Sequence, residues 1–203
     1  MPTEFQCELV SWNRVVGLAL KLARKIQQQG FQPDIIIAIG RGGYVPARLL
    51  ADYLDMMNLT DIKVEHYHSA EQMQTAKVKY GLSTDVSNQK VLLVDDVSDS
   101  GDTFVVAIEH ILQHSKPTTI RTVALHHKTT SKFVPDFYAA KIIKWRWLIY
   151  PWAQTEDISS FLSKLSPPIQ NKQDAITRLH QAYGIKVPDK LLEYLLWQKQ
   201  NVK

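Results

Sequence analysis

The 203-residue chain lacks the features that define several protein classes. Cys7 is its only cysteine, which excludes an internal disulfide, and we expect a reducing, cytoplasmic setting. No apolar run approaches the roughly 20 residues that span a bilayer, and no basic segment leads into an apolar one at the amino terminus. We therefore expect no membrane partner and no signal peptide. No lysine and arginine run accompanies the net charge of +4, so nucleic acid is an unexpected partner.

Strand and helix patterns alternate along most of the chain. Residues 35–39 and 91–94 are apolar throughout, which is typical of strands buried on both faces. Amphipathic helices are predicted over residues 11–30 and from Pro46, whereas the polar residues 69–89 are interpreted as a long exposed loop that could close as a lid. The alternation predicts an α/β fold, a mostly parallel sheet with helices on both faces.

The carboxyl-terminal fifth of the chain has a different pattern. Ser166-Pro167-Pro168 interrupts the sequence, and two amphipathic stretches separated by Gly184 and Pro188 follow. We therefore expect a main domain at 1–165 and a helical appendage at 166–203.

Residues 91–103 form the most informative run, Val-Leu-Leu-Val-Asp-Asp-Val-Ser-Asp-Ser-Gly-Asp-Thr. A buried-strand pattern leads into the paired acids Asp95 and Asp96, and a loop of small residues then leads into a helix pattern. Backbone N–H groups at the start of a helix cradle a phosphate. Two acids beside such a cradle favour a ligand with hydroxyls or a bound cation, and a sugar phosphate with magnesium fits both requirements.

Other phosphate and metal motifs fit this chain less well. No Gly-x-x-x-x-Gly-Lys-Ser/Thr loop occurs, and a dinucleotide fingerprint begun at Gly40 would need a third glycine where Val45 stands. A calcium loop begun at Asp96 would place Ala107 where a bidentate glutamate is required. The alternative without a ligand is a buried strand that ends in a solvated acidic turn.

The run resembles the signature of the type I phosphoribosyltransferases, most closely that of the bacterial and archaeal xanthine, guanine and hypoxanthine (6-oxopurine) enzymes. The resemblance implies that the chain binds 5-phosphoribosyl pyrophosphate, with Asp95 and Asp96 at the ribose hydroxyls and near Mg²⁺. It also implies that Asp99 lies near N7 of a purine and acts as base or proton partner. The residues expected around the sugar phosphate are Ser98, Ser100, Gly101, Asp102 and Thr103.

The glycine-rich segment at residues 40–43 resembles the pyrophosphate loop of the same family. Glycines allow the backbone to approach an anion, so Gly42 and Gly43 are expected in the site, and Arg41 adds a charged donor. The resemblance further implies a cis peptide bond between Gly40 and Arg41. The alternative is an ordinary glycine-rich turn with a surface arginine.

The resemblance to the same family also implies a base-binding hood at residues 128–158. Lys128 would donate to O6 of the base, Trp147 would stack on the ring, and backbone groups near Ile149 would bind the purine edge. The alternatives are that Lys128 is a solvated lysine at a strand end and that Trp147 is an aromatic residue of the core or of a dimer contact. This chain has Ala153 where several relatives carry an acid that helps to bind a second magnesium ion, and Glu156 and Asp157 come slightly later.

The resemblance as a whole implies a purine salvage enzyme that assembles as a homodimer or homotetramer. The enzyme would convert a 6-oxopurine and 5-phosphoribosyl pyrophosphate into the nucleoside 5-monophosphate and pyrophosphate. Two other interpretations stay open. The same fold serves in regulators that sense the sugar phosphate and bind nucleic acid, and in enzymes that act on a non-purine acceptor.

Overall fold

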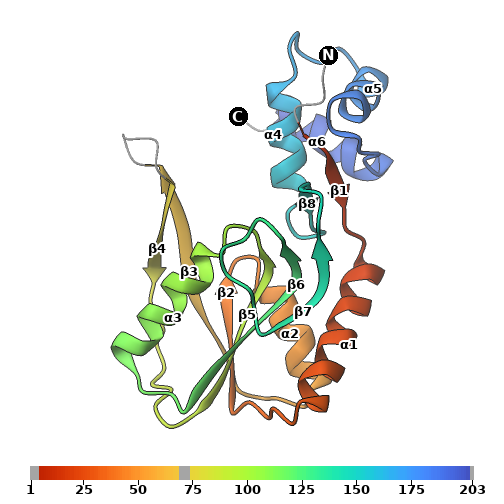
Figure 1. Cartoon of the computed structure of the whole chain (residues 1–203). Coiled ribbons are helices and arrows are strands. Elements are labelled where there is room, and N and C mark those ends of the chain that lie inside the picture. Colours follow the sequence, from red (N-terminus) through yellow and green to blue (C-terminus); the bar gives the residue numbers. More distant parts are fainter. Residues whose placement is uncertain (1–4, 69–73, 202–203) are drawn as a thin grey trace. The chain divides into compact units, whose positions relative to one another are not determined.

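The computed structural model describes residues 5–68 and 74–201 (Figure 1). Within these residues, no helix combines the length and the apolar composition that crossing a membrane requires. The elements in chain order are β1 (Cys7–Leu9), α1 (Trp12–Gln28), β2 (Ile35–Gly40), α2 (Tyr44–Tyr53), β3 (Leu59–His68), β4 (Gln74–Tyr80), β5 (Lys90–Ser98), α3 (Asp102–His114), β6 (Thr119–Lys128), β7 (Phe137–Ile142), β8 (Trp147–Ile149), α4 (Gln154–Lys164), α5 (Lys172–Tyr183) and α6 (Asp189–Asn201).

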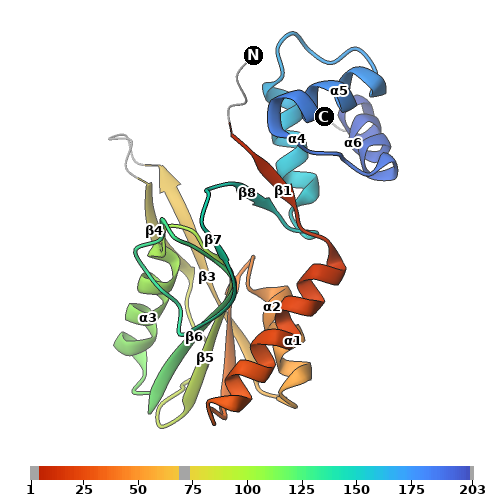
Figure 2. The same ribbon diagram turned by 45° about the vertical axis from the view of Figure 1, so that its right-hand side comes forward.

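The chain divides into two compact units, and Asn13–Lys144 forms the larger one. Its six-stranded sheet has the order β4-β3-β2-β5-β6-β7, in which only the pairing of β3 with β4 is antiparallel. Helix α3 lies on one side of this sheet, and α1 and α2 lie on the other (Figures 1 and 2). The α/β fold predicted from the alternating patterns is therefore confirmed.

Burial on both faces of the central strands explains their apolar sequences. All six residues of β2 are buried, and so are the four apolar residues and the acid of Val91–Asp95 in β5. On the α3 side, Phe104 and Ile111 pack against Ile37 and Leu93 in one core. On the opposite side, lysines of α1 donate to main-chain carbonyls of β7, which ties that helix to the edge of the sheet.

The exposed loop expected at residues 69–89 is partly wrong, because β4 pairs with β3 along most of its described length. The sequence did not indicate β4 because charged side chains occupy the surface of this strand pair. Glu65 of β3 forms ion pairs with both Lys63 and Lys79 at 3.0 Å. Among the residues of β4 whose side chains are described, Ala76 and Val78 pack against the core, so apolar alternation is weak. Residues 69–73 of the expected lid lie outside the described residues.

The second unit comprises the described parts of Met1–Trp12 and Trp145–Lys203. Strands β1 and β8 form a two-stranded parallel sheet, and the helices α4, α5 and α6 share a core with it. Helices α5 and α6 correspond to the two amphipathic patterns of the sequence. The division differs from the boundary expected at residue 165, because Ile149 and Phe161 pack in the same core as Leu179 and Leu192.

Candidate active site

The candidate site lies at the carboxyl ends of the neighbouring parallel strands β2 and β5. Pairing between these strands ends at Ala38 and Val94, whereas β5 continues beside β6 as far as Ser98. The paired acids therefore lie within β5, beyond the end of its pairing with β2. A Cβ placed on Gly42 would be 2.6 Å from an Asp96 carboxylate oxygen, so the glycine loop directly adjoins the acids.

A cavity of 240 Å³ opens between the glycine loop and the acidic run. It brings together seven of the residues that the sequence selected, including Arg41 and Asp99. The residues that line it are Ile39, Gly40, Arg41, Gly42, Val64, Asp95, Asp96, Val97, Asp99, Ser100 and Thr103. Ile39 and Val64, which the motifs did not single out, supply apolar wall.

The loop after β2 has the backbone that the resemblance implied, because the Gly40–Arg41 peptide bond is cis. Gly43, in contrast, does not line the cavity. Its N–H donates to the carbonyl of Ile39 at 2.8 Å, and a Cβ at this position would collide with backbone atoms of Val94 and Ile39. Gly43 thus allows the loop to pack on β5, which is a different role from the ligand contact expected.

The start of α3 lies at the cavity, where the sequence predicts an anion cradle. Gly101 has a φ of 93°, and its carbonyl accepts from the N–H groups of Phe104 and Val105 at 3.1 and 3.3 Å. A Cβ at Gly101 would collide with Phe133, so glycine is required here for both conformation and space. Main-chain N–H groups and the positive end of the helix dipole favour a phosphate at this point.

Ser98 has a different position from the one expected. Only 1% of its surface is exposed, and its hydroxyl lies 2.8 Å from both the Ser131 hydroxyl and the Phe133 carbonyl. The side chain therefore fastens the segment after β6 to the end of β5, and we no longer expect it to contact a ligand.

The paired acids create a strong preference for a cation. Asp95 is buried, and burial raises the pKa of its carboxyl well above the usual range, with a further rise from the charge of Asp96. A hydrogen bond from the Asp96 N–H to Asp95, 2.9 Å long, opposes that rise. A cation bound here would favour the ionised form of both acids.

The donor set fits magnesium that arrives with a substrate. Mg²⁺ is typically bound by one or two carboxylates together with substrate oxygens and water. Asp95 and Asp96 supply two carboxylates, and within the described residues no group of three or more His, Cys, Asp or Glu side chains could hold a metal alone. The acids therefore suit a cation shared with a sugar phosphate.

Lys128 and Asp99, which the resemblance assigned separately to the base, form an ion pair. The Lys128 ammonium lies 2.5 Å from an Asp99 carboxylate oxygen, with the lysine side chain 2% exposed and the aspartate side chain 41% exposed. Lys128 is the last residue of β6, so the sheet fixes its backbone. The Lys128 ammonium is a hydrogen-bond donor, and the neighbouring Asp99 carboxylate, which lines the cavity, is an acceptor.

Trp147 and Ile149 both lie on β8, in the second unit. Trp147 is 38% exposed, which leaves part of the indole surface accessible, whereas Ile149 is fully buried. The carbonyl of Ile149 accepts from the N–H of Val10 at 2.9 Å, a bond that joins β8 to β1. The side chain of Ile149 thus serves the core of this unit.

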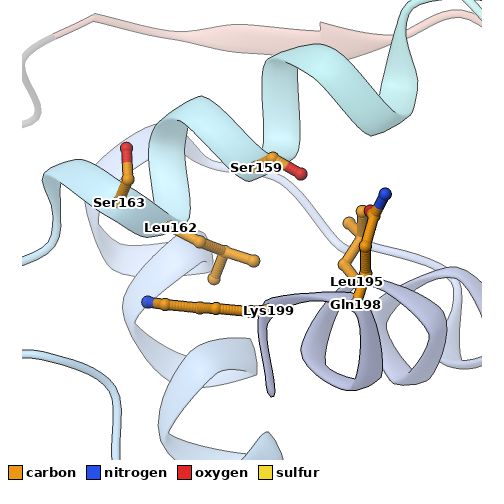
Figure 3. A pocket seen from close by; sticks show the side chains of 6 residues that line it. All are labelled: Ser159, Leu162, Ser163, Leu195, Gln198 and Lys199. Atoms are coloured by element: carbon orange, nitrogen blue, oxygen red, sulfur yellow. The ribbon is translucent and has the colours of Figure 1, made fainter. Parts of the chain in front are cut away.

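A larger hollow of 360 Å³ lies in the second unit between α4 and α6 (Figure 3). Two leucines line it, together with side chains that carry hydroxyl, amide and ammonium groups. Its lining residues are Ser159, Leu162, Ser163, Leu195, Gln198 and Lys199. None of these is a carboxylate or belongs to a phosphate-binding loop, so size alone does not make this hollow the candidate site.

Known proteins share this architecture. A xanthine-guanine phosphoribosyltransferase of Idiomarina loihiensis is 27% identical over 143 residues, which cover 70% of this chain and 84% of that protein. The crystal structure of a purine phosphoribosyltransferase from Pyrococcus horikoshii matches with a TM-score of 0.64 and 30% identity, covering 72% of this chain and 93% of that one. A hypothetical protein from Neisseria gonorrhoeae with bound ppGpp matches with a TM-score of 0.62 and 28% identity, covering 73% and 89%.

The phosphoribosyl transferase domain matches residues 7–154, a range that includes the whole sheet, the cavity and the strand that carries Trp147. Because this match spans most of the chain and agrees with the geometry at the ends of β2 and β5, the chain belongs to the phosphoribosyltransferase family.

Proposed function

We propose that this protein transfers the phosphoribosyl group of 5-phosphoribosyl pyrophosphate to N9 of a 6-oxopurine. The observation that carries the proposal is the single cavity that joins a glycine loop, two adjacent acids and the start of α3. These are the groups that a pyrophosphate, a ribose diol and a 5-phosphate each require. Relatives with purine and xanthine-guanine names support the choice of acceptor.

In the proposed reaction the chain mainly orients its substrates and stabilises charge. Arg41 and the backbone around Gly42 bind the departing pyrophosphate, while the 100–103 loop holds the phosphate end. Asp95 and Asp96 hold the ribose hydroxyls and would share the magnesium ion, which, when bound, supplies positive charge beside the leaving group. Exclusion of water from the cavity would protect the activated sugar from hydrolysis.

The Asp99–Lys128 pair supports a 6-oxopurine as acceptor. Such a base presents N7 with its proton next to the carbonyl oxygen O6, that is, a donor beside an acceptor. The carboxylate of Asp99 can accept from N7–H, and the ammonium of Lys128 can donate to O6. The two side chains, which pair with each other in the structure, therefore match this edge once the base lies between them. The amino group of adenine would face the Lys128 ammonium with donor against donor, which disfavours adenine.

Lys128→Ala is expected to lower kcat/KM for hypoxanthine and guanine about 10- to 100-fold, which is the value of one hydrogen bond to a charged group. Activity on adenine should change little. The measurement is steady-state kinetics with each base, with Lys116→Ala as the control, because Lys116 is an exposed lysine after the far end of α3. A wild-type enzyme that prefers adenine would contradict the assignment.

The direct test of the proposed function is pyrophosphate release from 5-phosphoribosyl pyrophosphate and magnesium against a panel of purines and pyrimidines. We expect turnover with at least one of hypoxanthine, guanine and xanthine, and much slower turnover with adenine, orotate and uracil. Turnover only with a pyrimidine would favour the non-purine enzyme. The homodimer or homotetramer stays a prediction, which light scattering on the purified protein checks.

A regulatory role at the same site is the second candidate. The neisserial structure holds ppGpp, which combines a purine with pyrophosphate groups, and the glycine loop and acid pair of this chain suit such a ligand. As an inhibitor, ppGpp would compete with 5-phosphoribosyl pyrophosphate in the release assay. A pure sensor would bind these ligands without turnover and would shift nucleic acid in an electrophoretic assay.

A further inference from the structure

The segment that follows β6 braces the phosphate loop, which we define as residues 100–103. Ser100 and Thr103 of this loop line the cavity. The bracing segment, residues 128–133, starts at the last residue of β6. Because the loop lies beyond the end of β5 at Ser98, its position depends on contacts with neighbouring segments such as this one.

Main-chain hydrogen bonding and ring stacking join the segment to the loop. The N–H of Lys132 donates to the carbonyl of Ser100 at 3.0 Å. The Phe133 ring stacks on Phe104 of α3, with the ring centroids 5.1 Å apart and the ring planes 11° apart. Phe104 is fully buried in the core on this side of the sheet, so the stack anchors the segment beside the start of the helix.

The Ser131 hydroxyl is the centre of a small cluster of hydrogen bonds. It lies 2.8 Å from the Ser98 hydroxyl and 2.9 Å from the Phe133 carbonyl oxygen, and it accepts from the Phe133 N–H at 3.2 Å. The Ser98 hydroxyl donates to the same carbonyl at 2.8 Å. Since Ser98 is only 1% exposed, its hydroxyl depends on these protein partners, and the cluster fixes the segment against the end of β5.

The same cluster lies against Gly101, the residue of the phosphate loop with a left-handed backbone. A Cβ on Gly101 would be 2.9 Å from Oγ of Ser131 and 2.8 Å from the nitrogen of Phe133. The cluster therefore bounds the space beside this glycine. A shift of Ser131 would release the Gly101 peptide, and with it the main-chain N–H groups that are expected to bind the phosphate.

We propose that Ser131 is a positioning residue for the 5-phosphate, because its hydroxyl, bonded to Ser98 and Phe133, holds the phosphate loop in the conformation that binds the anion. The inference rests on the proposed function, in which this loop binds the sugar phosphate. A loop held in its binding conformation loses little conformational freedom when the ligand arrives, so the affinity is raised. Ser98, which the sequence selected as a ligand contact, thus contributes to the site as part of the brace.

The other end of the segment is held independently of the Ser131 hydroxyl. The N–H of Ser131 donates to the Lys128 carbonyl at 3.0 Å, and the Lys128 ammonium pairs with Asp99. Removal of the hydroxyl leaves the groups that form both contacts in place. We therefore expect the loss to fall on binding at the phosphate loop, whereas the glycine loop and the acid pair keep their affinity for pyrophosphate.

The first measurement is calorimetry of the full chain with two probes that test opposite ends of the cavity. Ribose 5-phosphate tests the phosphate loop, and pyrophosphate with magnesium tests the glycine loop and the acid pair. Ser131→Ala should weaken ribose 5-phosphate binding about 10-fold and leave pyrophosphate binding within about 2-fold. Ser131→Thr retains the hydroxyl and should bind both probes as the wild type does.

A second substitution tests whether the two hydroxyls act as one brace. Ser98→Ala should also weaken ribose 5-phosphate binding, and the double variant should lose little more than Ser131→Ala alone. In steady-state kinetics, Ser131→Ala should raise KM for 5-phosphoribosyl pyrophosphate about 10-fold, with kcat and the KM for the purine within about 3-fold. Thr118→Ala is the matched control and should equal the wild type, because Thr118 is an exposed hydroxyl residue before the opposite end of β6.

The outcomes separate the inference from the proposed function. Equal losses of affinity for both probes in Ser131→Ala overturn the inference, because they indicate a general structural role, and so does wild-type affinity for ribose 5-phosphate. Binding that depends on Ser131 in a protein that turns over no purine supports the inference and contradicts the proposed acceptor. A wild type that binds neither probe contradicts the proposed function, and the inference falls with it. If Ser131→Ala fails to fold, Ser98→Ala with the same two probes decides in its place.

Discussion

Asp99→Asn is expected to lower kcat about 100- to 10,000-fold, the usual contribution of a positioned proton-transfer group. Asparagine has the size of aspartate and retains one acceptor oxygen toward the Lys128 ammonium, which lies 2.5 Å from Asp99 in the structure. It cannot, however, take the proton from N7 as N9 attacks the ribose. The effect should therefore fall on the chemical step and leave the binding of the sugar phosphate almost unchanged.

The measurement combines pyrophosphate release under saturating substrates with calorimetry of 5-phosphoribosyl pyrophosphate and magnesium. Asp52→Asn serves as the control, because Asp52 is an exposed aspartate on α2, outside the cavity lining. Urea denaturation checks that the variant stays folded, since Lys128 is 2% exposed and depends on a counter-charge. Losses of similar size in turnover and in sugar-phosphate affinity would count against the proton-transfer role.

The parts of the fold that could be predicted are those in which burial is uniform over several residues. The apolar runs of β2 and β5 are explained by burial on both faces, and such strands of a parallel sheet end at one edge. That rule alone was enough to bring the glycine loop near the acid pair, where a Cβ on Gly42 would lie 2.6 Å from Asp96. The cis bond at Gly40 came from the resemblance, since no local pattern indicates it.

The parts that could not be predicted depend on short elements or on distant partners. Strand β1 has three residues, which is too few for a periodic signal, and its pairing with β8 joins segments that lie far apart in the sequence. The Asp99–Lys128 ion pair joins residues 29 positions apart. Such contacts follow from packing of the whole unit, so only the structure reveals them.

Gly43→Ala is expected to destabilise the protein by about 3 kcal/mol, at the upper end of the usual cost of overpacking. A Cβ at this position would lie 2.7 Å from the carbonyl oxygen of Ile39 and 2.8 Å from its nitrogen, and it would also collide with the carbonyl of Val94. All of these are backbone atoms of the two central strands, which cannot turn aside as a side chain can. The glycine loop would have to move away from β5.

Urea denaturation measures this loss, and calorimetry with 5-phosphoribosyl pyrophosphate and magnesium measures the expected fall in affinity as the loop leaves the acid pair. Gly17→Ala is the matched control, because nothing lies within 4 Å of its added Cβ and it is exposed in the middle of α1. That change should stabilise the protein by about 0.5–1 kcal/mol. Wild-type stability and affinity in Gly43→Ala would mean that the loop tolerates a shift from β5, and the close approach of loop and acids would then be unnecessary for binding the sugar phosphate.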